Sequence, residues 1–390
     1  MELRSFLENN TLVVLLPEKI DTSNCQDFED SLNKIIAERE DFSKLILDLK
    51  NLIYISSVGL RSVLRLKQKF DDLTLINASS DVYDIFSMTG FTEIIKIEKV
   101  FREVSIEGCV VIGQGYYGKV YRISPDTIIK VYKMRGDIDN IRRERNLAQK
   151  AFVLGIPTAI SYDVVRVKEG GYGIIFELIN ADSFLKVIKE NPDKFDTYIE
   201  MYANLLNKIA STKINDDSLP SAKNNLKLWV NTIKGHFNDE ELKDINRLVE
   251  TLPDSDNMIH GDCHAKNIFI VDNEPVLIDM DTLAKGHRIF DFAAIYQTYI
   301  AYEASEPGNL ERFLGISKET GYKLFHNTLR TIYPTLSEEE YNLIVKKISF
   351  VGYVQLLNAV ENGGAPLAER IAMCENGIKS LAKELDTLDF

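Results

Sequence analysis

The most specific pattern in this sequence is Ile259-His260-Gly261-Asp262-Cys263-His264-Ala265-Lys266-Asn267, with Leu277-Ile278-Asp279-Met280-Asp281 one hairpin later. An aspartate on a loop can orient and deprotonate an attacking hydroxyl group. An amide oxygen five residues later and a carboxylate after the next hairpin can share a Mg²⁺ ion that bridges nucleotide phosphates. The spacing therefore predicts Asp262 as the catalytic base and Asn267 and Asp279 as metal ligands.

A glycine-rich segment lies upstream, and it reads Gly113-Gln114-Gly115-Tyr116-Tyr117-Gly118-Lys119-Val120. A dinucleotide-binding fold would need a helix after the glycines, but the next residues continue as a strand. A Walker A loop would need serine or threonine after the lysine, where Val120 stands. The pattern instead predicts a flap between two antiparallel strands, in which Gly113, Gly115 and Gly118 let the backbone approach phosphates.

A strand lysine and a helix carboxylate complete the predicted nucleotide site. Lys130 lies among β-branched residues in a strand-like run, and it is the candidate for the inner phosphates. Glu144, on the following helix, is the candidate partner that holds this lysine. The alternative is that Glu144 is a solvated carboxylate paired with a neighbouring arginine, Arg143 or Arg145.

Residues 104–390 resemble the aminoglycoside phosphotransferase and choline kinase branch of the protein kinase-like fold. The resemblance is carried by HGD at 260–262, LIDMD at 277–281 and GHRIFDFA at 286–293. It implies an α+β bilobal domain that binds ATP and Mg²⁺, with a small lobe at about 104–178, a hinge at about 177–183 and a helical lobe at about 184–390. It further implies that the backbone at Glu177 and Ile179 contacts adenine and that Asp291 braces the catalytic loop.

Residues 1–103 alternate between short apolar strands and amphipathic helices, which predicts a small α/β domain. The segment DLKNLIYISSVGLRSVL at 48–64 resembles a STAS domain, the fold of anti-sigma-factor antagonists. This resemblance implies that Ser57, at the start of a helix, is a regulatory phosphoacceptor, although Ser56 stands where the family has aspartate. The alternative is that Ser56 and Ser57 only cap the helix.

Charge and composition limit the partners. The 390 residues contain 46 Lys and Arg against 59 Asp and Glu, so the net charge of −13 argues against binding nucleic acid or anionic lipid through bulk electrostatics. We expect every apolar run to be shorter than the roughly 20 residues of a membrane span, and the first residues lack a secretory signal. We therefore expect a cytoplasmic protein with free thiols at its four cysteines. His260, Cys263 and His264 are too crowded for a closed zinc site.

Three functions compete at this point. We favour an ATP- and Mg²⁺-dependent phosphotransferase that acts on a hydroxyl or amine of a small-molecule acceptor, with the STAS domain as a regulatory or docking module for a protein partner. The first alternative is a signalling kinase that phosphorylates a STAS-domain serine. The second is a pseudokinase that binds nucleotide only as a scaffold, and the presence of Lys130, Asp262, Asn267 and Asp279 argues against it.

Overall fold

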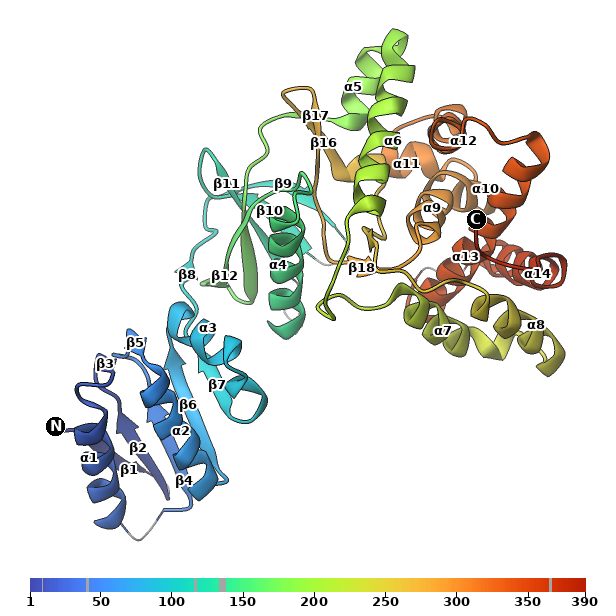
Figure 1. The fold of residues 1–390 in the computed structure, drawn as a ribbon. Helices are drawn as coiled ribbons and strands as arrows, with labels where there is room; N and C mark the ends of the chain where they lie inside the picture. Colours follow the sequence, from blue (N-terminus) through green and yellow to red (C-terminus); the bar gives the residue numbers. More distant parts are fainter. Residues whose placement is uncertain (9, 40–41, 116–117, 133–137, 365–366) are drawn as a thin grey trace. The chain divides into compact units, whose positions relative to one another are not determined.

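The computed structural model describes residues 1–8, 10–39, 42–115, 118–132, 138–364 and 367–390 (Figure 1). Its internal contacts divide the chain into two units. The first is Met1–Ser105 with Val165–Gly170, and the second is Ile106–Val164 with Gly171–Phe390. The division along the chain therefore falls two residues after the boundary expected at 103/104. Tyr116 and Tyr117 of the glycine-rich segment lie outside the described residues.

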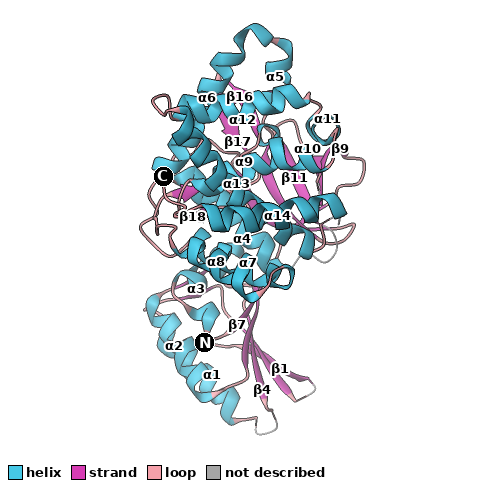
Figure 2. Ribbon diagram, turned by 90° about the vertical axis from the view of Figure 1, so that its right-hand side faces the viewer, coloured by secondary structure: helices cyan, strands magenta, loops and turns pink. Residues whose placement is uncertain are grey.

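A five-stranded sheet of order β1-β2-β4-β6-β7 forms the frame of the first unit. The pairings β2 to β4, β4 to β6 and β6 to β7 are parallel, while β1 is antiparallel to β2. Figure 2 shows helices α1, α2 and α3 on one side of this sheet. The elements are β1 (Arg4–Glu8), β2 (Thr11–Leu15), β3 (Lys19–Ile20), α1 (Cys25–Ala37), β4 (Lys44–Asp48), β5 (Tyr54–Ile55), α2 (Ser57–Lys69), β6 (Leu73–Ala78), α3 (Ser80–Met88), η1 (Phe91–Glu93), β7 (Lys96–Lys99) and β8 (Glu103–Val104).

The core of this unit forms where the strands meet the helices. Leu45 and Leu47 of β4 are fully buried, and so are Phe28 of α1 and Val63 of α2. Parallel strands connected through helices need this crossover arrangement, because a short turn cannot join parallel neighbours. The unit is therefore the two-layer α/β fold that the sequence predicts.

The second unit begins with a small lobe built on a sheet. The strands lie in the order β12-β13-β11-β10-β9, and antiparallel pairings join β9 to β10, β10 to β11 and β11 to β13. The short β8 pairs in parallel with Arg166 and Val167 of β12, which belong with it to the first unit. The elements are β9 (Val110–Gln114), β10 (Gly118–Arg122), β11 (Thr127–Tyr132), α4 (Ile138–Val153), β12 (Ser161–Val167) and β13 (Tyr172–Glu177).

Helices dominate the rest of the second unit, with the antiparallel hairpin β16–β17 among them (Figure 1). Residues 260–267, which include the predicted base Asp262, lie between β15 and β16. The elements are β14 (Asp182–Ser183), α5 (Phe184–Glu190), η2 (Pro192–Lys194), α6 (Phe195–Ser211), α7 (Ala222–Ile233), η3 (Lys234–His236), α8 (Asp239–Glu250), β15 (Met258–Ile259), η4 (Ala265–Asn267), β16 (Ile268–Val271), β17 (Glu274–Leu277), β18 (Ala284–Lys285), α9 (Ile289–Tyr296), η5 (Gln297–Ala301), α10 (Tyr302–Ser305), α11 (Asn309–Leu314), α12 (Lys318–Ile332), α13 (Glu338–Glu361) and α14 (Ala368–Glu384).

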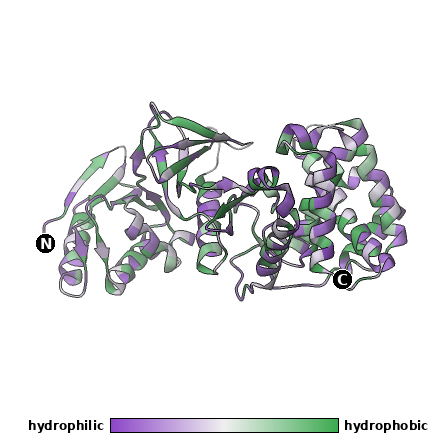
Figure 3. Ribbon diagram, turned by 90° about the horizontal axis from the view of Figure 1, so that it is seen from above, coloured by the Kyte–Doolittle hydropathy of each residue, from purple (hydrophilic) through white to green (hydrophobic). Residues whose placement is uncertain are grey.

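Helix α13 corrects one expectation. It is long and apolar enough, by length and composition, to span a membrane, whereas we expected every apolar run to be too short. However, Phe350, Val351 and Leu357 on this helix are fully buried, and it packs against α7, α9 and α14. In Figure 3 apolar and polar residues are mixed along the helices of this unit. Its packing is that of a central core helix.

Candidate active site

Lys130 joins the two lobes of the second unit. It lies on β11, and its Nζ is 2.8 Å from Oε1 of Glu144 on α4 and 2.7 Å from Oδ1 of Asp279, which follows β17. Burial alone would lower the pKa of Lys130, but the charges of Asp279 and Glu144 outweigh it and raise that pKa above its usual value. The lysine is therefore a held cation. Glu144 is a buried partner for it, with 8% of its side chain exposed, rather than a solvated carboxylate.

The loop from Asp262 to Asn267 folds back on itself. The Asn267 side-chain amide donates to the Asp262 backbone carbonyl over 3.0 Å and to Asp262 Oδ2 over 3.3 Å. The Asp262 carbonyl also accepts from the backbone amide of His264, and Ile278 N donates to the Asn267 carbonyl. These bonds fix the catalytic-base candidate and one metal-ligand candidate against each other. They also engage the Asn267 NH₂ group, so that its amide oxygen is the atom left for a metal.

Asp291 at the start of α9 anchors the beginning of this loop. Its Oδ1 accepts from the backbone amides of His260 (2.9 Å) and Gly261 (2.7 Å). Gly261 has a positive φ of 81°, and a Cβ there would lie 3.0 Å from the carbonyl oxygen of Thr282, so glycine is needed at this turn. This contact is the bracing role that the resemblance implied for Asp291.

Two buried tyrosines, which sequence reasoning missed, hold the middle of the loop. Tyr202 of α6 donates its hydroxyl proton to the Cys263 carbonyl, and the Ala265 amide donates to the Tyr299 hydroxyl over 2.8 Å. Both side chains are fully buried. Aromatic residues at helical spacing are usually core residues, and the sequence offered no signal that separates this pair from the others.

Three carboxylates, those of Asp262, Asp279 and Asp281, meet near the loop. Burial and the charges of Asp279 and Asp281 raise the pKa of Asp262 to about 7, although its side chain is 40% exposed. Burial and the charges of Asp279 and Glu144 raise the pKa of Asp281 to about 7. Asp279 itself has a left-handed backbone, with φ of 66°. Negative charge therefore accumulates here beyond what Lys130 neutralises, which is the environment that a cation prefers.

The donor set fits Mg²⁺ better than zinc. Within the described residues no group of three or more His, Cys, Asp or Glu side chains is arranged to hold a metal ion. Mg²⁺ commonly takes only one or two protein carboxylates and completes its shell with water and substrate phosphates. Burial lowers the pKa values of His260 and His264 to about 4, and the ring of His260 already accepts from the Asp262 amide.

The three glycines of the glycine-rich segment differ in the space beside them, and the two hinge residues differ in their backbone hydrogen bonds. A Cβ at Gly118 would clash with the Val131 carbonyl oxygen, whereas one at Gly113 would make only ordinary contacts. One at Gly115 would meet no atom of the described residues within 4 Å, its chain neighbours aside. In the hinge, the Glu177 amide already donates to Ile160, while Ile179 has no backbone hydrogen bond within the described part of the chain.

Ser57 lies in the first unit, as the first residue of α2, and it is exposed. The capping role belongs to Ser56, whose side chain accepts from the Gly59 amide over 3.5 Å. The alternative in which both serines cap the helix therefore holds only for Ser56, and Ser57 keeps an accessible hydroxyl group.

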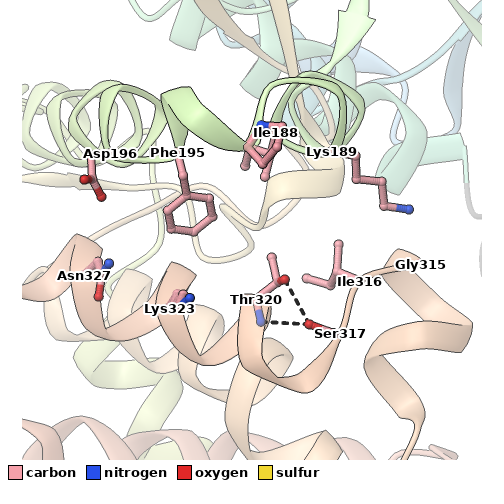
Figure 4. Close-up of a pocket in the computed structure, with 11 residues that line it drawn as sticks. Ile188, Lys189, Phe195, Asp196, Gly315, Ile316, Ser317, Thr320, Lys323 and Asn327 are labelled. Carbon is pink, nitrogen blue, oxygen red and sulfur yellow. Dashed lines mark hydrogen bonds between the residues drawn. The ribbon is translucent and has the colours of Figure 1, made fainter.

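A pocket of about 520 Å³ lies away from the predicted site residues (Figure 4). Ile188 and Lys189 of α5 and Phe195 and Asp196 of α6 face the start of α12 across it. None of the predicted site residues lines this pocket. Its charged lining side chains are exposed and include both signs, so the lining does not select one class of ligand.

Two family models match the sequence. Residues 7–105 match the STAS domain, and residues 109–322 match the phosphotransferase enzyme family. The chain is also similar to solved structures of aminoglycoside phosphotransferase APH(4)-Ia. A thermostable mutant in its apo form shares 10% identity, with 71% of this chain and 94% of that chain covered and a TM-score of 0.51. A ternary complex of such a mutant with ADP and hygromycin B shares 10% identity, with 71% of this chain and 96% of that chain covered and a TM-score of 0.50. At such low identity, this structural similarity shows a shared fold alone.

The fold and the site define a phosphotransferase built on the protein kinase-like fold. Because the second model covers more than half of the chain, this protein belongs to the phosphotransferase enzyme family, and a STAS domain precedes the phosphotransferase domain. Both resemblances drawn from the sequence are thus confirmed. No curated protein matches the chain significantly.

Proposed function

We propose that this protein transfers the γ-phosphate of Mg·ATP to a hydroxyl or amine group of a small-molecule acceptor. The observation that carries the proposal is the bridge from Lys130 to Glu144 and Asp279, at 2.8 and 2.7 Å. The bridge connects the small-lobe sheet and α4 to the metal-ligand candidate. A lysine held in this way is prepared to contact nucleotide phosphates.

Each residue then has a role in the proposed reaction. Asp262 orients the acceptor hydroxyl and takes its proton as the oxygen attacks the γ-phosphorus and the bond to the β-phosphate oxygen breaks. Asn267 and Asp279 would hold Mg²⁺, which supplies charge neutralisation on the phosphates. Gly113, Gly115 and Gly118 lie beside the phosphates, and Glu177 and Ile179 present hinge backbone to adenine.

The test is ATP consumption against a panel of hydroxylated amines, sugars and alcohols. Asp262→Asn should lower kcat with the active acceptor by about 100-fold or more, because a positioned base contributes about 10²–10⁴. Mg·ATP affinity should change little. Asp272→Asn is the matched control, since this aspartate lies in the β16–β17 turn with a left-handed backbone that asparagine also adopts. Near wild-type transfer by Asp262→Asn would remove Asp262 from the role of base.

We further propose that the STAS domain is a regulatory or docking module. The exposed Ser57 at the start of α2 supports this, because a helix N-terminus tolerates the charge of a phosphate. Incubation with Mg·ATP followed by peptide mapping should find phosphate on Ser57 only if the chain also acts as a protein kinase. Phosphate that disappears in both Ser57→Ala and Asp262→Asn would favour that second function. Its absence during turnover of a metabolite would leave the domain as a docking module.

A further inference from the structure

The segment between the proposed base and the proposed metal ligand is held by side chains from distant parts of the chain. Asp262 and Asn267 are separated by four residues, and two of these, Cys263 and Ala265, give backbone groups to Tyr202 and Tyr299. Bonds within the loop fix its ends but do not attach its middle to the rest of the lobe. The two tyrosine hydroxyls provide that attachment from α6 and from η5.

The two hydroxyls have different roles in these hydrogen bonds. The Cys263 carbonyl can only accept, so the Tyr202 hydroxyl donates to it. The Ala265 N–H can only donate, so the Tyr299 oxygen accepts from it. Tyr202 and Tyr299 therefore hold the middle of the loop through two separate hydrogen bonds, one at the Cys263 carbonyl and one at the Ala265 amide.

The local structure of the helix explains how Tyr299 reaches the loop. Residues Gln297–Ala301 form a π-helical segment between α9 and α10. Such segments insert one residue into a helix, change the direction of the side chains that follow, and are frequent at functional sites. Burial raises the pKa values of both tyrosines, so that both keep their protons at neutral pH.

We propose that Tyr299 and Tyr202 are positioning residues that set the spacing between Asp262 and Asn267 for phosphoryl transfer. The inference rests on the function proposed above. Neither hydroxyl touches the reacting atoms, and both act through the loop backbone. Loss of the Tyr202 hydroxyl leaves the Cys263 carbonyl without its donor, and loss of the Tyr299 hydroxyl leaves the Ala265 N–H without its acceptor. The loop should therefore lose its fixed geometry while the aromatic packing remains.

The experiment compares tyrosine-to-phenylalanine variants. Tyr299→Phe and Tyr202→Phe should each lower kcat by about 10- to 100-fold, the loss expected for a misplaced catalytic group, while KM for ATP stays within about twofold. The double variant should lose more than either single variant, because each hydroxyl holds the loop through its own hydrogen bond. The matched control is Tyr296→Phe on the neighbouring turn, which removes a tyrosine hydroxyl that is hydrogen-bonded to the Tyr353 hydroxyl at 2.9 Å. It should keep kcat.

Equal kcat in Tyr299→Phe and Tyr296→Phe would overturn the proposal, because both would then have only a structural role. A rise in KM with unchanged kcat would overturn it as well. Hydrogen exchange of the peptide that covers 262–267 separates this inference from the proposed function. If the wild-type protein transfers phosphate to no acceptor, the proposed function fails. Faster exchange in Tyr299→Phe than in Tyr296→Phe still supports the positioning role, and equal exchange overturns it.

Discussion

At the residue scale, alanine at two glycines of the same loop should have different effects on stability and on ATP binding. Gly118→Ala places a Cβ against the Val131 carbonyl oxygen, so it should distort the β10–β11 pairing and lower the melting temperature by several degrees. Gly115→Ala meets no atom of the described residues within 4 Å, so it should leave the melting temperature unchanged and raise KM for ATP. Thermal melts and steady-state kinetics measure both effects. A Gly115→Ala variant with wild-type KM would show that the nucleotide does not approach that residue.

Asp279 and Asp281 also differ in their predicted effect. Asp279→Asn keeps the left-handed backbone that asparagine tolerates but removes the charge beside Lys130, so Mg²⁺ titration should show weaker Mg·ATP binding and lower turnover. Asp281→Asn should be much milder, because we interpret Asp281 as a loop residue. If Asp281→Asn had the larger effect in the same titration, the metal would be held by the other carboxylate of this segment.

The site residues that belong to a short sequence motif could be predicted from the sequence. The residues that only the tertiary structure brings to the site could not. Asp262 and Asn267 are five residues apart, so their relation can be read from spacing. Lys130 and Asp279 are 149 positions apart, and only the resemblance connected them. Tyr202 and Tyr299 have neither signal, because a buried tyrosine with a functional hydroxyl looks the same in sequence as one that fills the core.

At the scale of elements, η3 is fixed to α13 and α14 by one histidine. Nδ1 of His236 is 2.7 Å from Glu375 and its Nε2 is 2.9 Å from Glu361. Burial would lower the pKa of His236, but the hydrogen bonds to the two glutamates outweigh it and raise that pKa. A histidine whose pKa is raised on folding stabilises the folded protein. This stabilisation is complete at pH values below the unfolded-state pKa, near 6.5, and is lost as the pH rises through the folded-state pKa.

His236→Gln should therefore lower the melting temperature most near pH 6, and the difference from wild type should shrink by pH 9. His326→Gln is the control. Burial lowers the pKa of His326, so wild-type His326 destabilises the folded protein at acid pH, and the melting-temperature difference should change with pH in the opposite direction. Melts of the three proteins from pH 6 to 9 check both trends. A difference for His236→Gln that does not vary with pH would mean that the ring stays neutral between its glutamates.

The strands and helices differ in how well the sequence predicts them. The aliphatic runs Thr11–Leu16 and Lys44–Leu49 predict two buried strands, and β2 and β4 match these runs to within one residue at each end. Strand β1 was not predicted, because it lies at the sheet edge with four of its five residues exposed and no apolar face. The π-helical turn at Gln297–Ala301 has no signature of its own, since its residues are also compatible with a regular helix.

At the scale of the whole molecule, the described residues form two large hydrophobic cores that share no residue. Leu47 belongs to the core of the first unit and Leu357 to that of the second. We expect calorimetry to show two unfolding transitions. Leu47→Ala should destabilise only one of them and Leu357→Ala only the other, each by about 2–5 kcal/mol.

Mg·ATP should stabilise only the transition that Leu357→Ala lowers, by about 2.7 kcal/mol at a concentration 100-fold above Kd. The expectation follows because the proposed nucleotide residues all belong to the second unit. A single transition that nucleotide shifts as a whole would show instead that the two units unfold cooperatively.

The left-handed backbone of Asp279 limits how this chain can be made more thermostable. A residue with a Cβ in that conformation is strained by about 1–2 kcal/mol, and glycine would relieve this strain. Selection for stability alone should therefore enrich glycine at position 279, and every such clone would lack the carboxylate that faces Lys130. Directed evolution for heat resistance should hold this position fixed and introduce its changes elsewhere in the chain.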